Sequence, residues 1–471
     1  MYFSSMTFLW IFLPATLVLY FIAERTKNVW AKNIVLLAAS LVFYAWGEPV
    51  YIFLMLFSVL INYLFGIFIS GDKVRFRKLL LFLAVVFNLS LLGFFKYFNF
   101  FAGNVNRILG YDAVAFSQFT LPLGISFYTF QAMSYVIDVY KKEVNAQKNF
   151  FSLLLYISLF PQLVAGPIVK YKDIEEQMRY RVSTDAKRAY GVKRFVYGLG
   201  KKVLLSNLMG KYVDMLLGFQ IKQLSTGLLW MAMIMYAFQL YYDFSGYSDM
   251  AIGLGSMFGF EFKENFNYPY ISKSIREFWN RWHISLSTWF KEYVYIPLGG
   301  NRKGNVRTYI NLVVVFFLTG FWHGAGLNFI FWGMLHGVFM VLERIGFGKI
   351  LDKNPLKLLN HLYTWFVVVC IWPFFRIESI REGCMYLKGM FVYQKGEYNL
   401  FSCMNFEVVL MILLCFLLCG MLQTLFPKFK HVLENREKIS VIEACGLLCI
   451  FLLCIVSLSA GAYNPFIYFR F

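Results

Sequence analysis

Apolar stretches of about 20 residues recur along the whole chain, and this pattern constrains the fold more than any other feature. The chain has 471 residues and is 59% hydrophobic, which is more apolar surface than a soluble protein of this length can bury. Within a bilayer every backbone polar group needs an internal partner, and runs of this length meet that need as helices. The sequence therefore predicts an all-α polytopic membrane protein.

We expect about 11–12 transmembrane helices, because each candidate segment is long enough to cross the hydrocarbon core. The candidate segments are 6–22, 31–47, 49–70, 79–95, 119–140, 190–208, 226–260, 308–322, 326–345, 357–376, 405–426 and 440–461. The segment 226–260 is expected to be broken, and 148–167 is expected to be re-entrant because it contains two prolines and a glycine. The first apolar run lacks a basic region before it, so we interpret it as a retained helix rather than a cleaved signal peptide.

The net charge of +19 comes from 45 Lys and Arg against 26 Asp and Glu. These basic residues gather in short loops between apolar runs, which is typical of the cytoplasmic side of a membrane protein and not of a nucleic-acid partner. With this orientation both chain termini lie outside the cytoplasm. All eight cysteines lie beyond residue 369 without metal-ligand spacing, so no metal site is predicted.

His323 is the first candidate catalytic residue, because it stands inside the apolar run next to Trp322 and between two glycines. An ionisable side chain in hydrocarbon is costly and usually faces a cavity, a partner or a substrate. Imidazole is also the side chain best suited to proton transfer near neutral pH. His336 would lie about 20 Å further along one straight helix, so we interpret it as structural and not as a partner of His323.

A second group of candidates precedes this run, in the segment Trp279-Asn280-Arg281-Trp282-His283. An interfacial helix with an aromatic belt and a snorkelling cation explains the tryptophans and the arginine, but it explains His283 less well. A third group, Asp243 and Ser245, interrupts the apolar run 226–260. These side chains either line a polar cavity or cap a broken helix, and the sequence leaves both interpretations open.

The chain ends on the aromatic segment Phe466–Phe471, where a terminus is normally polar. Anchoring in the membrane interface is one interpretation of this segment, and folding back into a groove is the other. No G-x-S-x-G elbow, Walker loop or H-E-x-x-H motif is present, so the common soluble hydrolase, nucleotide and zinc-protease classes have no support.

Several of these segments together resemble the membrane-bound O-acyltransferase (MBOAT) family. The resemblance rests on Ser126–Tyr140, which includes Gln131, and on three further segments. These segments are Phe160–Pro167, Asp243–Asp249 and Gly320–Gly326. The stretch from Glu277 to Gly304 resembles the alginate O-acetyltransferase branch, and the segment 350–440 supports no residue-level comparison.

The resemblance implies an MBOAT fold with a tunnel through the bilayer and places the family's two histidines at His323 and His283. The last residues resemble the acyl-carrying tail of bacterial cell-envelope acylation systems, which implies that Tyr468 accepts the acyl group. We therefore expect one transmembrane domain, 1–461, and an extracytoplasmic acyl-carrying tail, 462–471. The same resemblance implies that Trp279, Asn280, Arg281, Trp282, Trp322, Gln131, Asp243 and Ser245 line the substrate path.

The function implied is transfer of an acetyl group from a cytoplasmic thioester, acetyl-CoA, across a bacterial cell membrane to a secreted or cell-envelope polysaccharide. No bound cofactor is expected, and the expected partner is an extracytoplasmic serine transferase of the SGNH type. Transfer of D-alanine to teichoic acid from a carrier-protein thioester is the alternative within the family. A transporter or flippase is the alternative from another class, because broken helices and buried polar groups suit transport as well.

Overall fold

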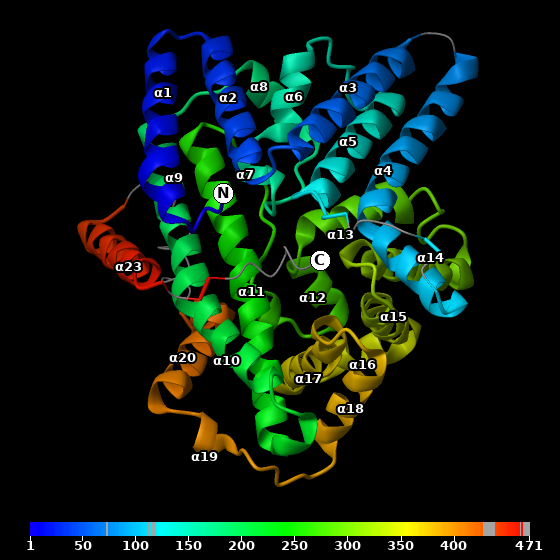
Figure 1. The fold of residues 1–471 in the computed structure, drawn as a ribbon, viewed down its shortest axis with the longest axis vertical. Helices are drawn as coiled ribbons and strands as arrows, with labels where there is room; N and C mark the ends of the chain where they lie inside the picture. The colour runs from blue at the N-terminus through cyan, green and yellow to red at the C-terminus, as the bar shows by residue number, and fades with distance from the viewer. Residues whose placement is uncertain (72–73, 112, 115–118, 427–438, 462, 465–471) are drawn as a thin grey trace. The chain divides into compact units, whose positions relative to one another are not determined.

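The computed structural model describes residues 1–71, 74–111, 113–114, 119–426, 439–461 and 463–464. Within these residues the regular elements are helices (Figure 1), and one isolated β-bridge joins Leu224 and Tyr398. The chain divides into two compact units. Unit 1 comprises 1–195 with 250–263, and unit 2 comprises 196–249 with 264–471.

Unit 1 contains the helices of the first two fifths of the chain. They are η1 (Phe8–Phe12), α1 (Leu13–Arg25), α2 (Val29–Gly47), α3 (Tyr51–Ser70), α4 (Val74–Leu109), α5 (Ile125–Tyr140), α6 (Phe150–Ser158), α7 (Phe160–Leu163), α8 (Tyr171–Arg179) and most of α9 (Asp185–Gly200). Side-chain caps define several of their starts, as at α2, where the Asn28 side chain accepts from the backbone N–H of Trp30. Between α3 and α4, Asn62 and Asn88 donate to each other at 3.1 and 2.7 Å, so neither buried amide is left without a partner.

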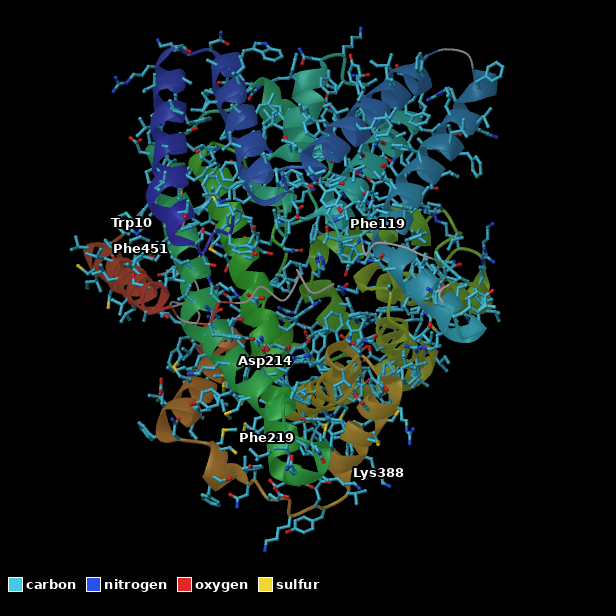
Figure 2. All side chains as sticks on the ribbon, viewed as in Figure 1. Trp10, Phe119, Asp214, Phe219, Lys388 and Phe451 are labelled. Carbon is cyan, nitrogen blue, oxygen red and sulfur yellow. The ribbon has the colours of Figure 1, made fainter. Side chains whose placement is uncertain are left out.

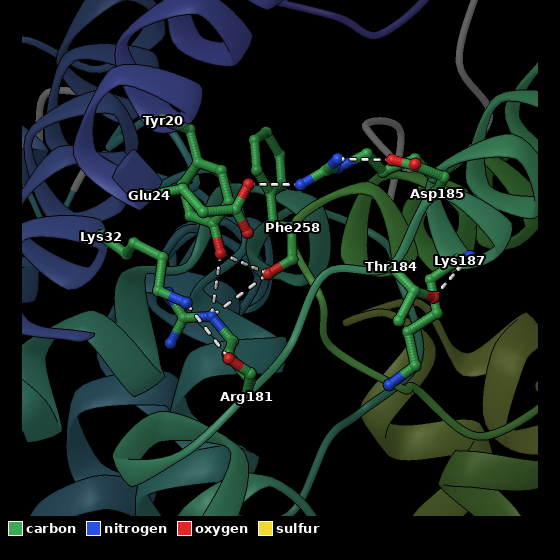
Figure 3. A network of polar contacts seen from close by, with 9 residues as sticks. Tyr20, Glu24, Lys32, Arg181, Thr184, Asp185, Lys187 and Phe258 are labelled. Atoms are coloured by element: carbon green, nitrogen blue, oxygen red, sulfur yellow. Dashed lines mark hydrogen bonds and ion pairs between the residues drawn. The ribbon is translucent and has the colours of Figure 1, made fainter. Parts of the chain in front are cut away.

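A buried arginine joins distant segments of unit 1 (Figure 3). The Arg181 guanidinium donates to the Tyr20 hydroxyl at 3.2 Å and to the Phe258 carbonyl at 3.1 Å. Lys32 donates to the Arg181 carbonyl at 3.1 Å, and Arg188 pairs with Glu24. The loop before α9 is therefore held against α1, α2 and the end of α11 by charge-assisted hydrogen bonds.

Unit 2 contains the remaining helices and the large aromatic core. Its elements before the long hairpin are η2 (Lys201–Ser206), α10 (Asn207–Leu217), η3 (Ile221–Gln223), α11 (Thr226–Met257, shared with unit 1), η4 (Pro269–Ile271), α12 (Ile275–Arg281), α13 (Ile284–Phe290) and η5 (Lys291–Tyr295). The hairpin and the elements after it are α14 (Gly304–His323), α15 (Leu327–Leu342), η6 (Glu343–Phe347), α16 (Gly348–Lys353), α17 (Lys357–Arg376), α18 (Ile380–Phe391), α19 (Leu400–Cys403), α20 (Phe406–Phe416), η7 (Leu417–Met421), α21 (Leu422–Leu425) and α23 (Val441–Ser459). Four tryptophans, Trp279, Trp282, Trp332 and Trp372, belong to one buried cluster in this unit.

Nine helices of the described part of the chain are long and apolar enough to cross a membrane. They confirm the prediction of an all-α polytopic membrane protein. The predicted segments 119–140, 190–208 and 226–260 also form helices, which are α5, α9 with η2, and α11. The segment 148–167 forms the short helices α6 and α7, and every residue from 153 to 170 is buried, as irregular backbone at membrane depth requires.

The prediction of a broken helix at 226–260 is wrong, because α11 runs without interruption from Thr226 to Met257. Two contacts within unit 2 explain its continuity. The Asp243 carboxylate pairs with Lys202 at 2.6 Å, so a charge that would otherwise disfavour burial is neutralised. A Cβ on Gly246 would lie 2.7 Å from the carbonyl oxygen of Gly198, so the glycine serves close helix packing and not a helix end.

Candidate active site

His323 is the last residue of α14, and its side chain is buried with 4% of its surface exposed. Aromatic rings surround it within unit 2. The ring of Trp322 lies 5.0 Å from the imidazole between centroids, Trp332 lies at 5.2 Å and Phe375 at 5.3 Å. These rings keep bulk water away from the imidazole, and in such a site electrostatic interactions are stronger than in water.

Glycines bring the helices of this site close together. A Cβ on Gly320 of α14 would lie 2.3 Å from the Phe329 carbonyl oxygen, and one on Gly333 of α15 would lie 2.4 Å from the Phe316 carbonyl oxygen. The segment 324–326 ends α14 and reverses the chain, so α14 and α15 pack as an antiparallel pair. This close packing places Trp332 of α15 against His323 of α14.

His283 lies at the turn between α12 and α13 and is fully buried. Its backbone is left-handed, with φ 43° and ψ 54°, a conformation that costs a non-glycine residue about 1–2 kcal/mol. Asn265 holds this turn through both its backbone and its side chain. Its carbonyl accepts from the Ile284 N–H at 2.9 Å, and its Oδ1 accepts from the Ser285 N–H at 3.2 Å.

The hydrogen bonds of Asn265 also fix the tautomer of His283. The Ser285 backbone N–H can only donate, so the amide oxygen of Asn265 must face it, and the amide nitrogen donates to Ser248 at 3.1 Å. That same oxygen lies 3.1 Å from the His283 Nδ1, which must therefore carry the proton. The Nε2 of His283 is left with a lone pair and can accept a proton or a hydrogen bond.

Burial lowers the pKa of His283 from 6.5 to about 3, because an imidazolium would lose its hydration there. The side chain is therefore neutral across the physiological pH range. A neutral imidazole whose Nε2 carries a lone pair can act as a hydrogen-bond acceptor.

Trp322 brings the two histidines together. Its indole centroid lies 6.0 Å from the His283 ring and 5.0 Å from the His323 ring. The two histidines are 40 positions apart in the sequence, yet both contact one tryptophan in unit 2. The structure thus joins the two predicted catalytic histidines in one aromatic site.

Helix α12 supplies the opposite wall of this site. Trp279 is buried, lies 5.8 Å from the Trp332 ring and donates from Nε1 to the Nδ1 of His336 at 3.3 Å. Trp282 is also buried and lies 5.6 Å from the Trp372 ring. The interpretation of His336 as remote from His323 needs correction, because α14 and α15 are separate helices and Trp332 contacts both histidine rings.

Two polar residues position α12, and the sequence analysis named neither of them. The Glu343 carboxylate accepts from the backbone N–H groups of Ile275 and Arg276 at 2.6 and 3.0 Å, at the start of the helix. Ser274 supplies a side-chain cap to the same helix at 3.0 Å. Ser274 followed three residues later by Glu277 is a helix-start pattern that can be recognised in the sequence. Glu343 has no such local pattern, because it stands 68 positions away from Ile275.

The other predicted residues have separate surroundings. Asn280 is exposed, and Arg281 pairs with Glu277 at 2.9 Å and donates to the Asn267 carbonyl, so both lie outside the buried ring cluster. Asp243 pairs with Lys202, and Ser245 is buried beside it on α11. Of the two interpretations for this pair, the cap of a broken helix is wrong.

Of the remaining two predicted residues, one lies in unit 1 and the other outside the described residues. Gln131 is fully buried on α5 in unit 1, and among the described residues its side-chain amide has no hydrogen-bond partner. Tyr468 lies outside the described residues. No group of three or more side chains in the described ranges is arranged to hold a metal ion.

Comparison with known proteins identifies the family. Residues 145–385 match the model of the MBOAT, membrane-bound O-acyltransferase family, and they include both histidines of the site. The chain belongs to the membrane-bound O-acyltransferase family. It is therefore a multi-pass membrane acyltransferase, which confirms the prediction of an enzyme over that of a transporter.

Full-length relatives refine the assignment within this acyltransferase family. The chain is 38% identical to the probable alginate O-acetylase AlgI of Pseudomonas putida, and the comparison covers all of both chains. It is 38% identical to the peptidoglycan O-acetyltransferase of Helicobacter pylori over 82% of this chain and 79% of the relative. The teichoic acid D-alanyltransferase of Bacillus subtilis is 32% identical over 46% of this chain and 58% of the relative. The predicted likeness to the alginate O-acetyltransferase branch is confirmed.

Proposed function

We propose that this acyltransferase moves an acetyl group from a cytoplasmic thioester, acetyl-CoA, through Tyr468 to an extracytoplasmic polysaccharide. The names of the two relatives that cover most of the chain, an alginate O-acetylase and a peptidoglycan O-acetyltransferase, support acetyl transfer to a polysaccharide. The D-alanyltransferase covers less than half of the chain and gives the alternative less support.

One observation carries the proposal: two buried histidines flank a single tryptophan in an aromatic site. A phenol is a weak nucleophile until a base removes its proton, since its pKa is about 10. His323 is proposed to be that base. Its burial among Trp322, Trp332 and Phe375 excludes the water that would otherwise hydrolyse the donor.

In the first step the Tyr468 oxygen attacks the carbonyl carbon of the thioester while His323 takes the phenolic proton. The new C–O bond forms, the C–S bond breaks, and the thiolate leaves. The imidazolium of His323 returns its proton to the thiolate, so the products are acetyl-tyrosine and free thiol. His283 positions the donor or a water in the tunnel, and its Nε2 lone pair suits acceptance of a hydrogen bond.

In the second step a hydroxyl oxygen attacks the acetyl-tyrosine on the outer side of the membrane. Its C–O bond to the acetyl carbon forms, the bond to the tyrosine oxygen breaks, and the hydroxyl proton passes to the phenolate. We propose an extracytoplasmic transferase of the SGNH serine-hydrolase type as the partner that carries the acetyl group on. The orientation rests on the basic loops, which place the donor side in the cytoplasm and the tail outside.

The test is mass spectrometry of the C-terminal peptide after incubation of the purified protein with isotope-labelled acetyl-CoA. We expect the label on Tyr468 in the wild type and its loss in both Tyr468→Phe and His323→Ala. Tyr393→Phe and His361→Ala are the matched controls, because Tyr393 is 83% exposed and the His361 Nδ1 lies against the Ser272 carbonyl, away from the rings around His323.

Each outcome of this experiment decides one part of the proposal. Label on Tyr468 that persists in His323→Ala would refute His323 as the base. A wild type without label on Tyr468 would refute the acetyl-tyrosine relay from this donor. The same assay with a D-alanyl carrier-protein thioester then tests the alternative directly.

A further inference from the structure

The chain returns to α10 after its last helix, α23. The Asn207 side chain donates to the Asn464 side chain at 3.2 Å, and the Tyr463 hydroxyl donates to the Asp214 carboxylate. The Tyr463 ring also passes over Gly210, where an added Cβ would lie 3.2 Å from a ring carbon. Three successive contacts therefore fix residues 463 and 464 on one helix.

The three contacting positions of α10 share one face. Positions 207, 210 and 214 follow an i, i+3, i+7 spacing, which places side chains along one stripe of a helix. A Cβ on Gly210 would lie 2.5 Å from the Gln239 amide nitrogen and 3.2 Å from the Tyr463 ring, so the glycine leaves room for both side chains. This face of α10 therefore carries two polar residues, Asn207 and Asp214, with the small residue Gly210 between them.

This stripe connects to the wall of the catalytic site within unit 2. Asp214, labelled on α10 in Figure 2, accepts with its other carboxylate oxygen from Arg376 at 2.8 Å. Arg376 is the last residue of α17, and its neighbour Phe375 lies 5.3 Å from the His323 ring. Asp214 therefore bridges the segment before the tail to the helix that packs against His323.

We infer that Asn207, Gly210 and Asp214 anchor the C-terminal segment at Tyr463 and Asn464, and thereby position Tyr468 for acylation. The inference rests on the proposed function of Tyr468 as the acyl acceptor. The three α10 residues and Tyr463 are positioning residues, because they act through the tail and take no part in bond making.

The length of chain after the anchor gives the expected size of the effect. Tyr468 stands five positions after Tyr463 but nine after Ser459, the last residue of α23. At roughly 3.6 Å per residue, these lengths reach about 18 and 32 Å. For a flexible tether, the local concentration of the tethered group falls with about the 3/2 power of the tether length. If the group instead samples the whole sphere within its reach, the concentration falls with the cube of that reach, which gives the upper bound of the effect. Release of the anchor should therefore slow acylation about two- to sixfold.

The experiment uses full-length protein with one hydroxyl removed. Tyr463→Phe deletes only the atom that bonds to Asp214 and keeps the ring over Gly210. Tyr212→Phe is the matched control, because Tyr212 also lies on α10 but its hydroxyl accepts from Asn405 instead. We measure the initial rate at which label from acetyl-CoA appears on Tyr468, together with the rate at which carboxypeptidase releases Phe471.

We expect Tyr463→Phe to label more slowly, by at most the roughly sixfold effect of full release because Asn464 still bonds to Asn207, and to lose Phe471 faster, while Tyr212→Phe matches the wild type. Asp214→Asn combined with Tyr463→Phe should be no slower than the slower single variant, because the hydrogen bond between the two residues is already removed in Tyr463→Phe. A purely structural role of Tyr463 would not produce this dependence on Asp214. Equal labelling rates in the wild type and in Tyr463→Phe would overturn the inference.

The carboxypeptidase measurement separates this inference from the proposed function. If the wild type is not labelled at Tyr468, the relay fails, but faster release of Phe471 from Tyr463→Phe would still support the anchor. If release is equally fast in the wild type, Tyr463→Phe and Tyr212→Phe, the anchor is refuted whether or not Tyr468 carries the label.

Discussion

Asn265→Ala should reverse the tautomer of His283. We expect it to reduce acyl transfer strongly while the protein remains folded. Asn265 is fully buried, and its side chain makes four hydrogen bonds, three accepted by Oδ1 and one donated by Nδ2. Without it, the Ser285 hydroxyl, which lies 3.4 Å from the His283 Nδ1, can donate to that nitrogen. The proton then moves to Nε2, and the lone pair on that nitrogen is lost.

The structure allows both losses to be estimated. At about 1 kcal/mol for each hydrogen bond, with one recovered by Ser285, the free energy of unfolding should fall by about 3 kcal/mol. Loss of the group that fixes a histidine tautomer costs roughly 10- to 100-fold in metal sites, and we expect a similar loss of acyl transfer here. We measure acetyl transfer from labelled acetyl-CoA and thermal unfolding in the same lipid preparation.

Two further variants make this prediction refutable. Asn267→Ala is the matched control, since Asn267 is exposed and bonds to Arg281 through its backbone carbonyl and N–H, which the substitution keeps. Asn265→Asp keeps an acceptor opposite the His283 Nδ1, so it should recover more activity than Asn265→Ala. Wild-type activity in Asn265→Ala would refute the tautomer argument, and equal loss in the Ala and Asp variants would reduce Asn265 to a packing residue.

Three other predictions concern packing, charge and pH. Gly333→Ala places a Cβ 2.4 Å from a backbone oxygen of the facing helix, so it should lower the free energy of unfolding by about 1–3 kcal/mol and remove most of the activity. Gly93→Ala is the control, because an added Cβ there meets nothing within 4 Å and should reduce neither quantity in unfolding and transfer assays. Lys202→Met should cost about 3–5 kcal/mol by removing the cation that pairs with the buried Asp243 carboxylate. Lys202→Met with Asp243→Leu should restore the stability measured by thermal unfolding. The pKa of His283 is lowered from 6.5 to about 3, so between these pH values the unfolded chain binds a proton that the folded chain does not. The free energy of unfolding should therefore be highest above pH 6.5 and should fall by up to about 1.4 kcal/mol for each pH unit below it. His283→Gln should flatten this acidic decline in melting temperature, and an unchanged slope would contradict the assignment.

The sequence was sufficient to predict the helical membrane fold and to single out His323 as a candidate, because both depend on local signals, whereas His283 was singled out through the family resemblance. Apolar run length predicts spans, and a histidine inside such a run is visible without any knowledge of tertiary contacts. The sequence also divided this region into the candidate segments 308–322 and 326–345, although the distance from His323 to His336 was reckoned along one straight helix.

The partners of the site residues could not be predicted, because each lies far away along the chain. Asn265 and His283 are 18 positions apart, Ile275 and Glu343 are 68 apart, and Trp279 and His336 are 57 apart. The continuous course of α11 was missed for the same reason. The pairing of Asp243 with Lys202 exists only in the folded chain, so the carboxylate alone suggested a break.

A tyrosine relay would solve a physical problem that a buried histidine alone does not. A CoA thioester carries charged phosphates, and the cost of moving such charges through hydrocarbon keeps the donor on the cytoplasmic side. A neutral acetyl group on a phenol carries no such cost. Because a phenol has a pKa of about 10, far below that of a sugar hydroxyl, its acetyl ester retains enough free energy to acetylate a polysaccharide without further activation. The proposed anchor on α10 would complement this chemistry, since it would limit how far the acceptor can move from the buried His323, the proposed base.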